Sequence, residues 1–108
     1  MQMFDTYQAA ALRTAKPMET VDDDLLHAGL GLSGEVGEFA DALKKHFFYG
    51  APLDRANCKE ELGDILWYIA LGAAALGTTL GELAEQNIAK LRKRYPEKFT
   101  EQLAATRL

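Results

Sequence analysis

The sequence has little of several residues that mark other classes of protein. Its single cysteine, Cys58, cannot form a disulfide within the chain, which suits a reducing compartment. Only three prolines occur in 108 residues, and each stands where a predicted helix would have to stop. Twelve Lys and Arg face sixteen Asp and Glu, so the charge gives no support to binding of a nucleic acid polymer.

Long apolar runs are also missing. The most apolar stretch, residues 65–81, reads ILWYIALGAAALGTTLG. It is shorter than the ~20 residues that a membrane-spanning helix needs, and glycines and threonines interrupt it. The first residues, MQMFDTYQ, contain no basic segment followed by an apolar one. We therefore expect no membrane association and a cytoplasmic location.

Period-two alternation, the mark of a half-buried strand, is absent, whereas apolar residues recur at helical spacing. Short loops between long helices favour antiparallel neighbours, so residues 1–108 are predicted to form one all-α domain, a four-helix antiparallel bundle that assembles into an oligomer. Residues 100–108 can add one or two further turns. The expected helices run from about Phe4 to Ala15, from Asp22–Asp24 to Gly50, from an Asp54 cap to Gly77, and from a Thr79–Glu82 capping box to about Tyr95.

Two pairs of acids stand out against the apolar faces of the second and third helices. Glu35 and Glu38 are three residues apart, and Glu61 and Asp64 repeat the spacing, so each pair shares a helix face. If the two helices pack together, four carboxylates meet, and their mutual repulsion requires a compensating cation. Oxygen donors alone favour Mg²⁺, or Mn²⁺, over Zn²⁺. The plainer interpretation is that such pairs are solvated helix faces.

Basic and amide side chains of the fourth helix could bind an anion. Asn87, Lys90 and Arg94 share one face of that helix, and their donors suit phosphate oxygens. Lys45 lies two turns after Glu38 on the same side of the second helix, where it could reach the far end of a polyphosphate. Bases near a helix C-terminus also interact favourably with the helix dipole, and for Lys90 and Arg94 both interpretations stay open.

Three ring-bearing residues are the weaker candidates, for a nucleobase. Trp67 and Tyr68 follow Asp64 by three and four residues, and His27 lies two turns before Glu35. Each could stack on a base or form a hydrogen bond with one. For all three, a structural role in packing is the competing interpretation.

These motifs resemble those of the MazG-like all-α nucleoside triphosphate pyrophosphohydrolases. The resemblance rests on GLSGEVGEFADALKK, EELGDILWYIALGA and NIAKLRKRYPEKF and covers residues 25–99. It includes an ExxE motif, Glu35 to Glu38, and an ExxD motif, Glu61 to Asp64, separated by 22 residues.

The resemblance implies Mg²⁺-dependent hydrolysis of a (deoxy)nucleoside triphosphate to a monophosphate and pyrophosphate. The ExxE and ExxD acids would be catalytic metal ligands, Lys45 and the fourth-helix residues would bind phosphate, and the assembly would be a homodimer or homotetramer. Cleansing of nucleotide pools is the implied role. A di-iron bundle is disfavoured, because it needs Glu-x-x-His on two helices. The alternative kept open is a non-catalytic helical module that binds a nucleotide or a protein.

Overall fold

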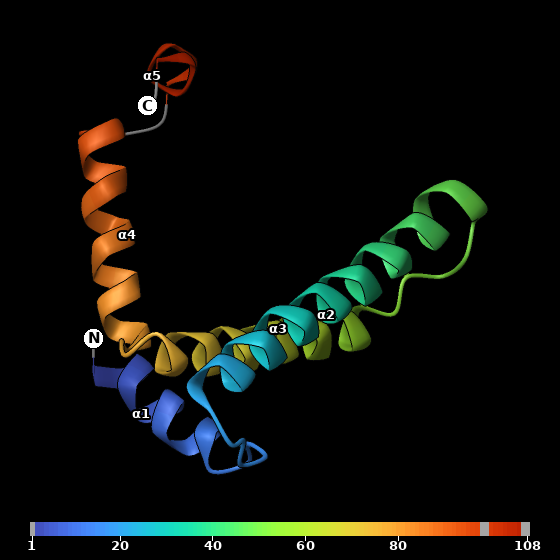
Figure 1. Ribbon diagram of the computed structural model, residues 1–108. Coiled ribbons are helices and arrows are strands. Elements are labelled where there is room, and N and C mark those ends of the chain that lie inside the picture. The colour runs from blue at the N-terminus through green and yellow to red at the C-terminus, as the bar shows by residue number, and fades with distance from the viewer. Residues whose placement is uncertain (1, 98–99, 107–108) are drawn as a thin grey trace.

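The computed structural model describes residues 2–97 and 100–106, which form helices joined by short turns (Figure 1). No strand occurs within these residues, so the prediction of an all-α fold is confirmed. A short helix in the C-terminal tail agrees with the expected extra turns, and the remaining tail residues, 107–108, lie outside the described part. The helices are α1 (Gln2–Leu12), α2 (Val21–Tyr49), α3 (Arg55–Ala75), α4 (Leu80–Arg94) and α5 (Glu101–Ala105).

Local sequence signals account for most helix ends. Asp54 accepts a hydrogen bond from the backbone N–H of Asn57 at 3.0 Å and so caps α3 as predicted. Gly50 ends α2 in the left-handed conformation, at φ 72°, which costs glycine little. The start of α2 differs slightly from the prediction. Thr20 is its N-cap, and the three acids lie inside the first turn, where they face the positive end of the helix dipole.

The capping box of α4 is only half formed. Thr79 accepts from the backbone N–H of Glu82 at 3.1 Å, as predicted. The Glu82 carboxylate accepts from the Thr78 hydroxyl. Gly77, at φ 75°, makes the turn between α3 and α4.

The first helix ends at Leu12, three residues earlier than predicted. The Ala11 carbonyl, which would accept from residue 15 in a continuing α-helix, is taken by other donors. The Thr14 hydroxyl donates to it at 2.7 Å, and the indole Nε1–H of Trp67 donates to it at 3.1 Å. The helix end is therefore held by the local Thr14 and by a contact from α3, and local sequence could not reveal the second.

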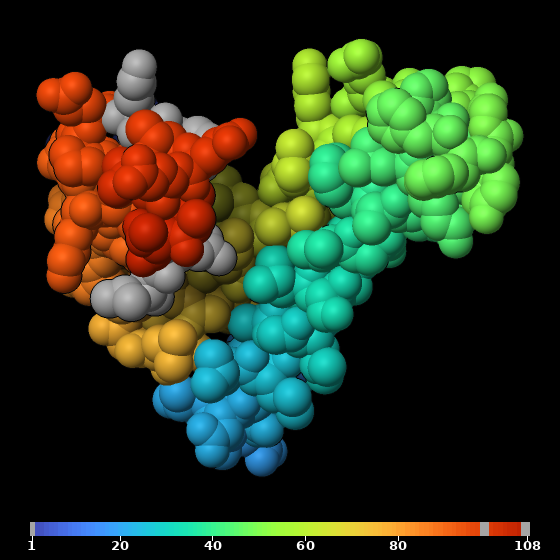
Figure 2. Space-filling view, turned by 90° about the horizontal axis from the view of Figure 1, so that it is seen from above, coloured from blue at the N-terminus to red at the C-terminus, as the bar shows by residue number. Residues whose placement is uncertain are grey.

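The main packing unit is an antiparallel hairpin of α2 and α3 (Figure 1). The first helix packs against α3 and the start of α4, and α4 leaves the end of α3 at a bend of 97°. The predicted four-helix bundle is therefore not confirmed within one chain. Instead the hairpin and the α4–α5 arm form the two sides of a V in the space-filling view (Figure 2).

The core of the single chain is small. It gathers around Ala70, Ala73 and Leu80, with Tyr7, Leu66 and Leu83 packed against it. No large side chain among the described residues is fully buried. The radius of gyration is 16.9 Å, against ~13 Å for a compact domain of this length. Apolar residues that recur at helical spacing, and that we expect to face a core, are left in part at the surface, including Leu62, Leu76 and Phe47.

Among the described residues, no single helix is long and apolar enough to cross a membrane. Within residues 2–97 and 100–106, the pair α3 and α4 passes that test of length and composition when counted together, and the two helices are bent by 97° at their junction.

Candidate metal and nucleotide site

Three carboxylates meet between the paired helices α2 and α3. Glu35 and Glu38 project from α2 and Glu61 from α3, and one carboxylate oxygen of each lies within 4.8 Å of the others. The spacing of three residues keeps the two α2 acids on one face, and the antiparallel pairing brings α3 opposite them. We call Glu35, Glu38 and Glu61 the acidic cluster.

Two oxygens of the acidic cluster are closed off from water without a hydrogen-bond partner. They belong to Glu35 and Glu61, whereas Glu38 is exposed. The adjacent Glu35 carboxyl, which can share a proton with Glu61, raises the pKa of Glu61 to about 7, and loss of water contact and Glu38 add to this. A bound proton or a cation is what such a cluster requires, because like charges this close disfavour one another.

Asp64 is the predicted ligand that the structure leaves outside the acidic cluster. It lies one turn further along α3 than Glu61, and its side chain is exposed. Its role as a ligand therefore stays a prediction.

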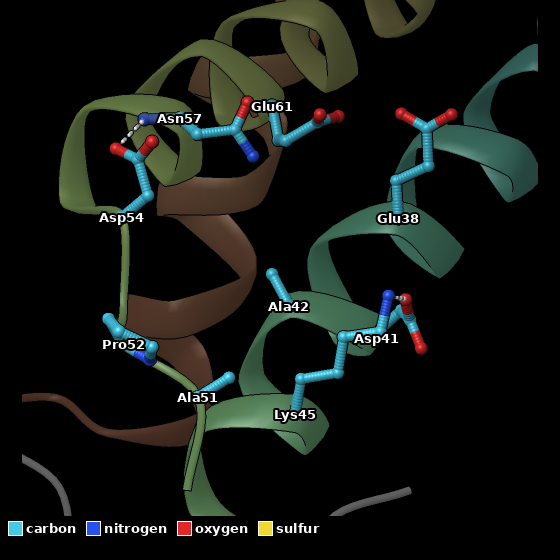
Figure 3. Close-up of a pocket in the computed structure, with 9 residues that line it drawn as sticks. All are labelled: Glu38, Asp41, Ala42, Lys45, Ala51, Pro52, Asp54, Asn57 and Glu61. Atoms are coloured by element: carbon cyan, nitrogen blue, oxygen red, sulfur yellow. Dashed lines mark hydrogen bonds and ion pairs between the residues drawn. The ribbon is translucent and has the colours of Figure 1, made fainter. Parts of the chain in front are cut away.

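A cleft of about 330 Å³ opens beside the acidic cluster and extends to the turn between α2 and α3 (Figure 3). Lys45 lines this cleft, as the predicted phosphate contact should, and its Nζ forms an ion pair with Asp41 at 2.8 Å. The lysine lowers the pKa of Asp41, and the aspartate raises that of Lys45, through their hydrogen bond. The lining residues are Glu38, Asp41, Ala42, Lys45, Ala51, Pro52, Asp54, Asn57 and Glu61.

Sequence reasoning missed Asn57, whose amide is the uncharged polar side chain of the cleft lining (Figure 3). The signal that could have identified Asn57 in the sequence was its spacing from the Asp54 cap and from Glu61. Those spacings place Asn57 in the first turn of α3, one turn before the metal-ligand candidate.

The predicted phosphate-binding residues of α4 do not join the acidic cluster within one chain. Asn87, Lys90 and Arg94 lie along α4, which packs on α1 and the end of α3 and points away from the hairpin (Figure 1). None of the three lines the cleft. Sequence could place them on one helix face but could not set the direction of that helix.

The three base-binding candidates pack on one another. The rings of His27 and Tyr68 meet edge to face with centroids 5.8 Å apart, and those of Trp67 and Tyr68 at 5.0 Å. The Trp67 indole N–H also donates to Thr14 Oγ1 at 2.9 Å. None of these residues lines the cleft. Their contacts favour the packing role, and base binding stays a prediction.

The Tyr68 ring explains one of the glycines beside the acids. A Cβ added to Gly31 would overlap Tyr68 Cε1, so only glycine admits the ring. A Cβ on Gly34 or Gly37 would meet nothing within 4 Å. Close approach within the chain therefore accounts for Gly31 alone of these three.

Comparison with known proteins decides the family. The model of the MazG nucleotide pyrophosphohydrolase domain matches residues 25–99. The chain belongs to the MazG family. The matched MazG region contains α3, α2 from Leu25 onward and all four predicted acids. A relative from Mycobacterium phage L5, named Gene 37 protein, is 35% identical over 98 residues, which is 83% of this chain and 86% of that protein. No solved structure gives a significant match. MazG proteins are nucleotide pyrophosphohydrolases and are typically metal-dependent.

Proposed function

We propose that this protein hydrolyses (deoxy)nucleoside triphosphates at the α–β phosphoanhydride bond in the presence of Mg²⁺. The observation that supports this most is the acidic cluster, whose shielded, unpartnered oxygens border an open cleft. On a solvated acidic helix face, those oxygens would be in contact with water. Membership of the MazG family supports the same reaction class.

The donor set fits a hard divalent cation. Glu35, Glu38 and Glu61 offer three carboxylates and no sulfur or imidazole, which favours Mg²⁺ or Mn²⁺. Asp64 is the proposed fourth ligand. When bound, the cation would neutralise phosphate oxygens and increase the acidity of a nearby water.

The chain's own side chains supply the remaining steps. Glu38 is exposed on the cleft side of the acidic cluster, where it can accept a proton from an attacking water. Lys45 can direct its ammonium to phosphate oxygens after leaving Asp41. In-line attack at the α-phosphorus releases pyrophosphate and leaves the monophosphate. Cleansing of nucleotide pools in the cytoplasm is the role that we propose for this reaction.

We also propose that the protein works as a homodimer or a higher homo-oligomer. The single chain exposes 8259 Å², about 2,300 Å² more than the ~6,000 Å² expected for a folded monomer of 11.9 kDa. Two copies together therefore carry an excess of about 4,600 Å². Obligate interfaces bury roughly 2,000–5,000 Å² summed over both partners, so this excess matches one large interface of that kind. We propose a second copy as the partner, because the excess area belongs to a chain whose own core is small.

The outer surface of α2 is the region that we assign to this contact. A hollow of about 460 Å³ is lined there by Leu25, Leu26, Gly29 and Leu30, and Leu30 is 66% exposed. We further propose that α4 of one copy approaches the cleft of the other, which would give Lys90 and Arg94 their predicted phosphate contacts.

Replacing Glu38 by Gln tests the enzyme against the non-catalytic module. The change keeps the size of the side chain and removes its charge, and Glu60→Gln, on the exposed side of α3, is the matched control. Nucleotide chromatography should show Mg²⁺-dependent turnover by the parent and the control, and at least a hundredfold loss in Glu38→Gln. Circular dichroism should be the same for all three. Equal turnover by Glu38→Gln would refute the site, and nucleotide binding without turnover by the parent would favour the module.

A further inference from the structure

The start of α4 is held by two side chains of α1. Gln8 Oε1 accepts from the backbone N–H of Leu80 at 3.0 Å, and Asp5 Oδ1 accepts from that of Gly81 at 3.0 Å. Thr79, the N-cap, takes the next N–H group. The first turn of a helix has no acceptors of its own for these groups. A helix distant in the sequence therefore completes the cap of α4.

Gln8 connects three segments at once. Besides its bond to α4, its Nε2 donates to the Ala70 carbonyl in α3 at 3.2 Å. Gln8 is 6% exposed and lies beside the small core formed by Ala70, Ala73 and Leu80. Loss of the bond to α4 would leave the buried backbone N–H of Leu80 without a partner, which is costly.

Apart from these bonds, the junction between α3 and α4 is held by the small core, where Leu80 packs with Ala70 and Ala73. The two helices diverge by 97°, so they touch only near the turn, where Gly77 adopts a positive φ. Beyond its first turns α4 is exposed along most of its length. The first helix, in contrast, packs against both α3 and α4 and is fixed at its other end by the Trp67 hydrogen bonds.

We infer that Asp5 and Gln8 are positioning residues that set the direction of α4 and, through it, the place of Lys90 and Arg94. From Leu80 to Arg94 the helix extends ~21 Å, so a 20° change at the junction would move Arg94 by ~7 Å. That displacement exceeds the reach of a hydrogen bond. The effect on phosphate binding rests on the proposed function, but the control of the helix direction does not.

Distances between spin labels test the helix direction without any assay of activity. Nitroxides are attached at Lys59→Cys in α3 and Lys93→Cys in α4, both exposed, in a Cys58→Ser background. Dilution with unlabelled protein isolates the distance within one chain. Asp5→Ala and Gln8→Met each remove an acceptor from α4, and Gln86→Met, at an exposed site on α4, controls for the substitution itself.

The parent and Gln86→Met should give the same narrow distance distribution. Asp5→Ala and Gln8→Met should broaden or displace it by several ångströms with unchanged helix content, and Asp5→Asn, which keeps the acceptor oxygen, should restore it. Distributions identical to the parent in the two test variants would overturn the inference. If Gln8→Met does not fold, the exposed Asp5 decides through its own variant.

Kinetics then connect the helix direction to the site. Asp5→Ala should raise KM for a nucleoside triphosphate more than it lowers kcat, because the cluster on the hairpin is intact. A displaced helix in a protein that hydrolyses no triphosphate would refute the proposed function and leave the positioning role standing. An undisplaced helix in an active enzyme would do the reverse.

Discussion

Binding of a divalent cation should release a proton whose amount depends on pH in a defined way. The cation competes with the proton that Glu61 shares with Glu35, because metal ligands must be deprotonated. With the pKa of Glu61 raised to about 7, the group is about 90% protonated at pH 6, about half at pH 7 and about 10% at pH 8. We expect binding to release roughly those fractions of a proton.

Calorimetric titration with MnCl₂ in buffers of different ionisation enthalpy measures this release directly. The heat should depend on the buffer strongly at pH 6 and weakly at pH 8, and the apparent affinity should rise between them. Glu61→Gln should abolish the release and weaken binding, whereas Glu60→Gln should change neither. Binding with no proton release at pH 6 would refute the shared-proton description of the acidic cluster.

The other predictions concern pH, packing and assembly. The pKa of Glu61 is raised from 4.5 to about 7, so its contribution to stability is fully present below pH 4.5 and lost as the pH rises through 7. The increase in melting temperature on adding Mg²⁺ should therefore be larger at pH 8 than at pH 6. Gly31→Ala should destabilise the fold by about 1–3 kcal/mol in urea unfolding, since its Cβ would overlap Tyr68, whereas Gly63→Ala, with open space around it, should not; equal effects would contradict the packing. Trp67→Phe should lower the free energy of unfolding by about 1–2 kcal/mol, because it removes the hydrogen bonds to Ala11 and Thr14. KM should not change, and a large rise in KM would instead support the predicted contact of Trp67 with a base. Light scattering should give at least twice the 11.9 kDa of one chain, and Leu30→Glu should reduce that mass; a monomer in the parent would exclude the dimer.

Sequence was informative where the relevant interactions are local. The caps at Asp54 and Thr79, the break at Gly50 and the spacing of Glu35 and Glu38 depend on neighbouring residues, and they agree with the structure. The pairing of Glu61 with the α2 acids also followed, because a short turn joins two long helices in antiparallel order.

Contacts between distant segments explain what the sequence could not supply. The early end of α1 includes a hydrogen bond from Trp67 in α3, and the cap of α4 depends on Gln8 in α1. Helical periodicity identified apolar faces correctly but could not say whether they are covered by the same chain. The predicted bundle assumed that they are, and the exposed Leu62 and Phe47 show that one chain leaves them in part uncovered.

The bond that is broken tests the proposed function most directly. The protein should be incubated with Mg²⁺ and each common nucleoside and deoxynucleoside triphosphate, and the products followed by ³¹P NMR. The proposal predicts pyrophosphate together with the nucleoside monophosphate from at least one substrate, and neither product from the Glu38→Gln variant. Orthophosphate with the nucleoside diphosphate would mean attack at the γ-phosphorus and would contradict the proposed reaction.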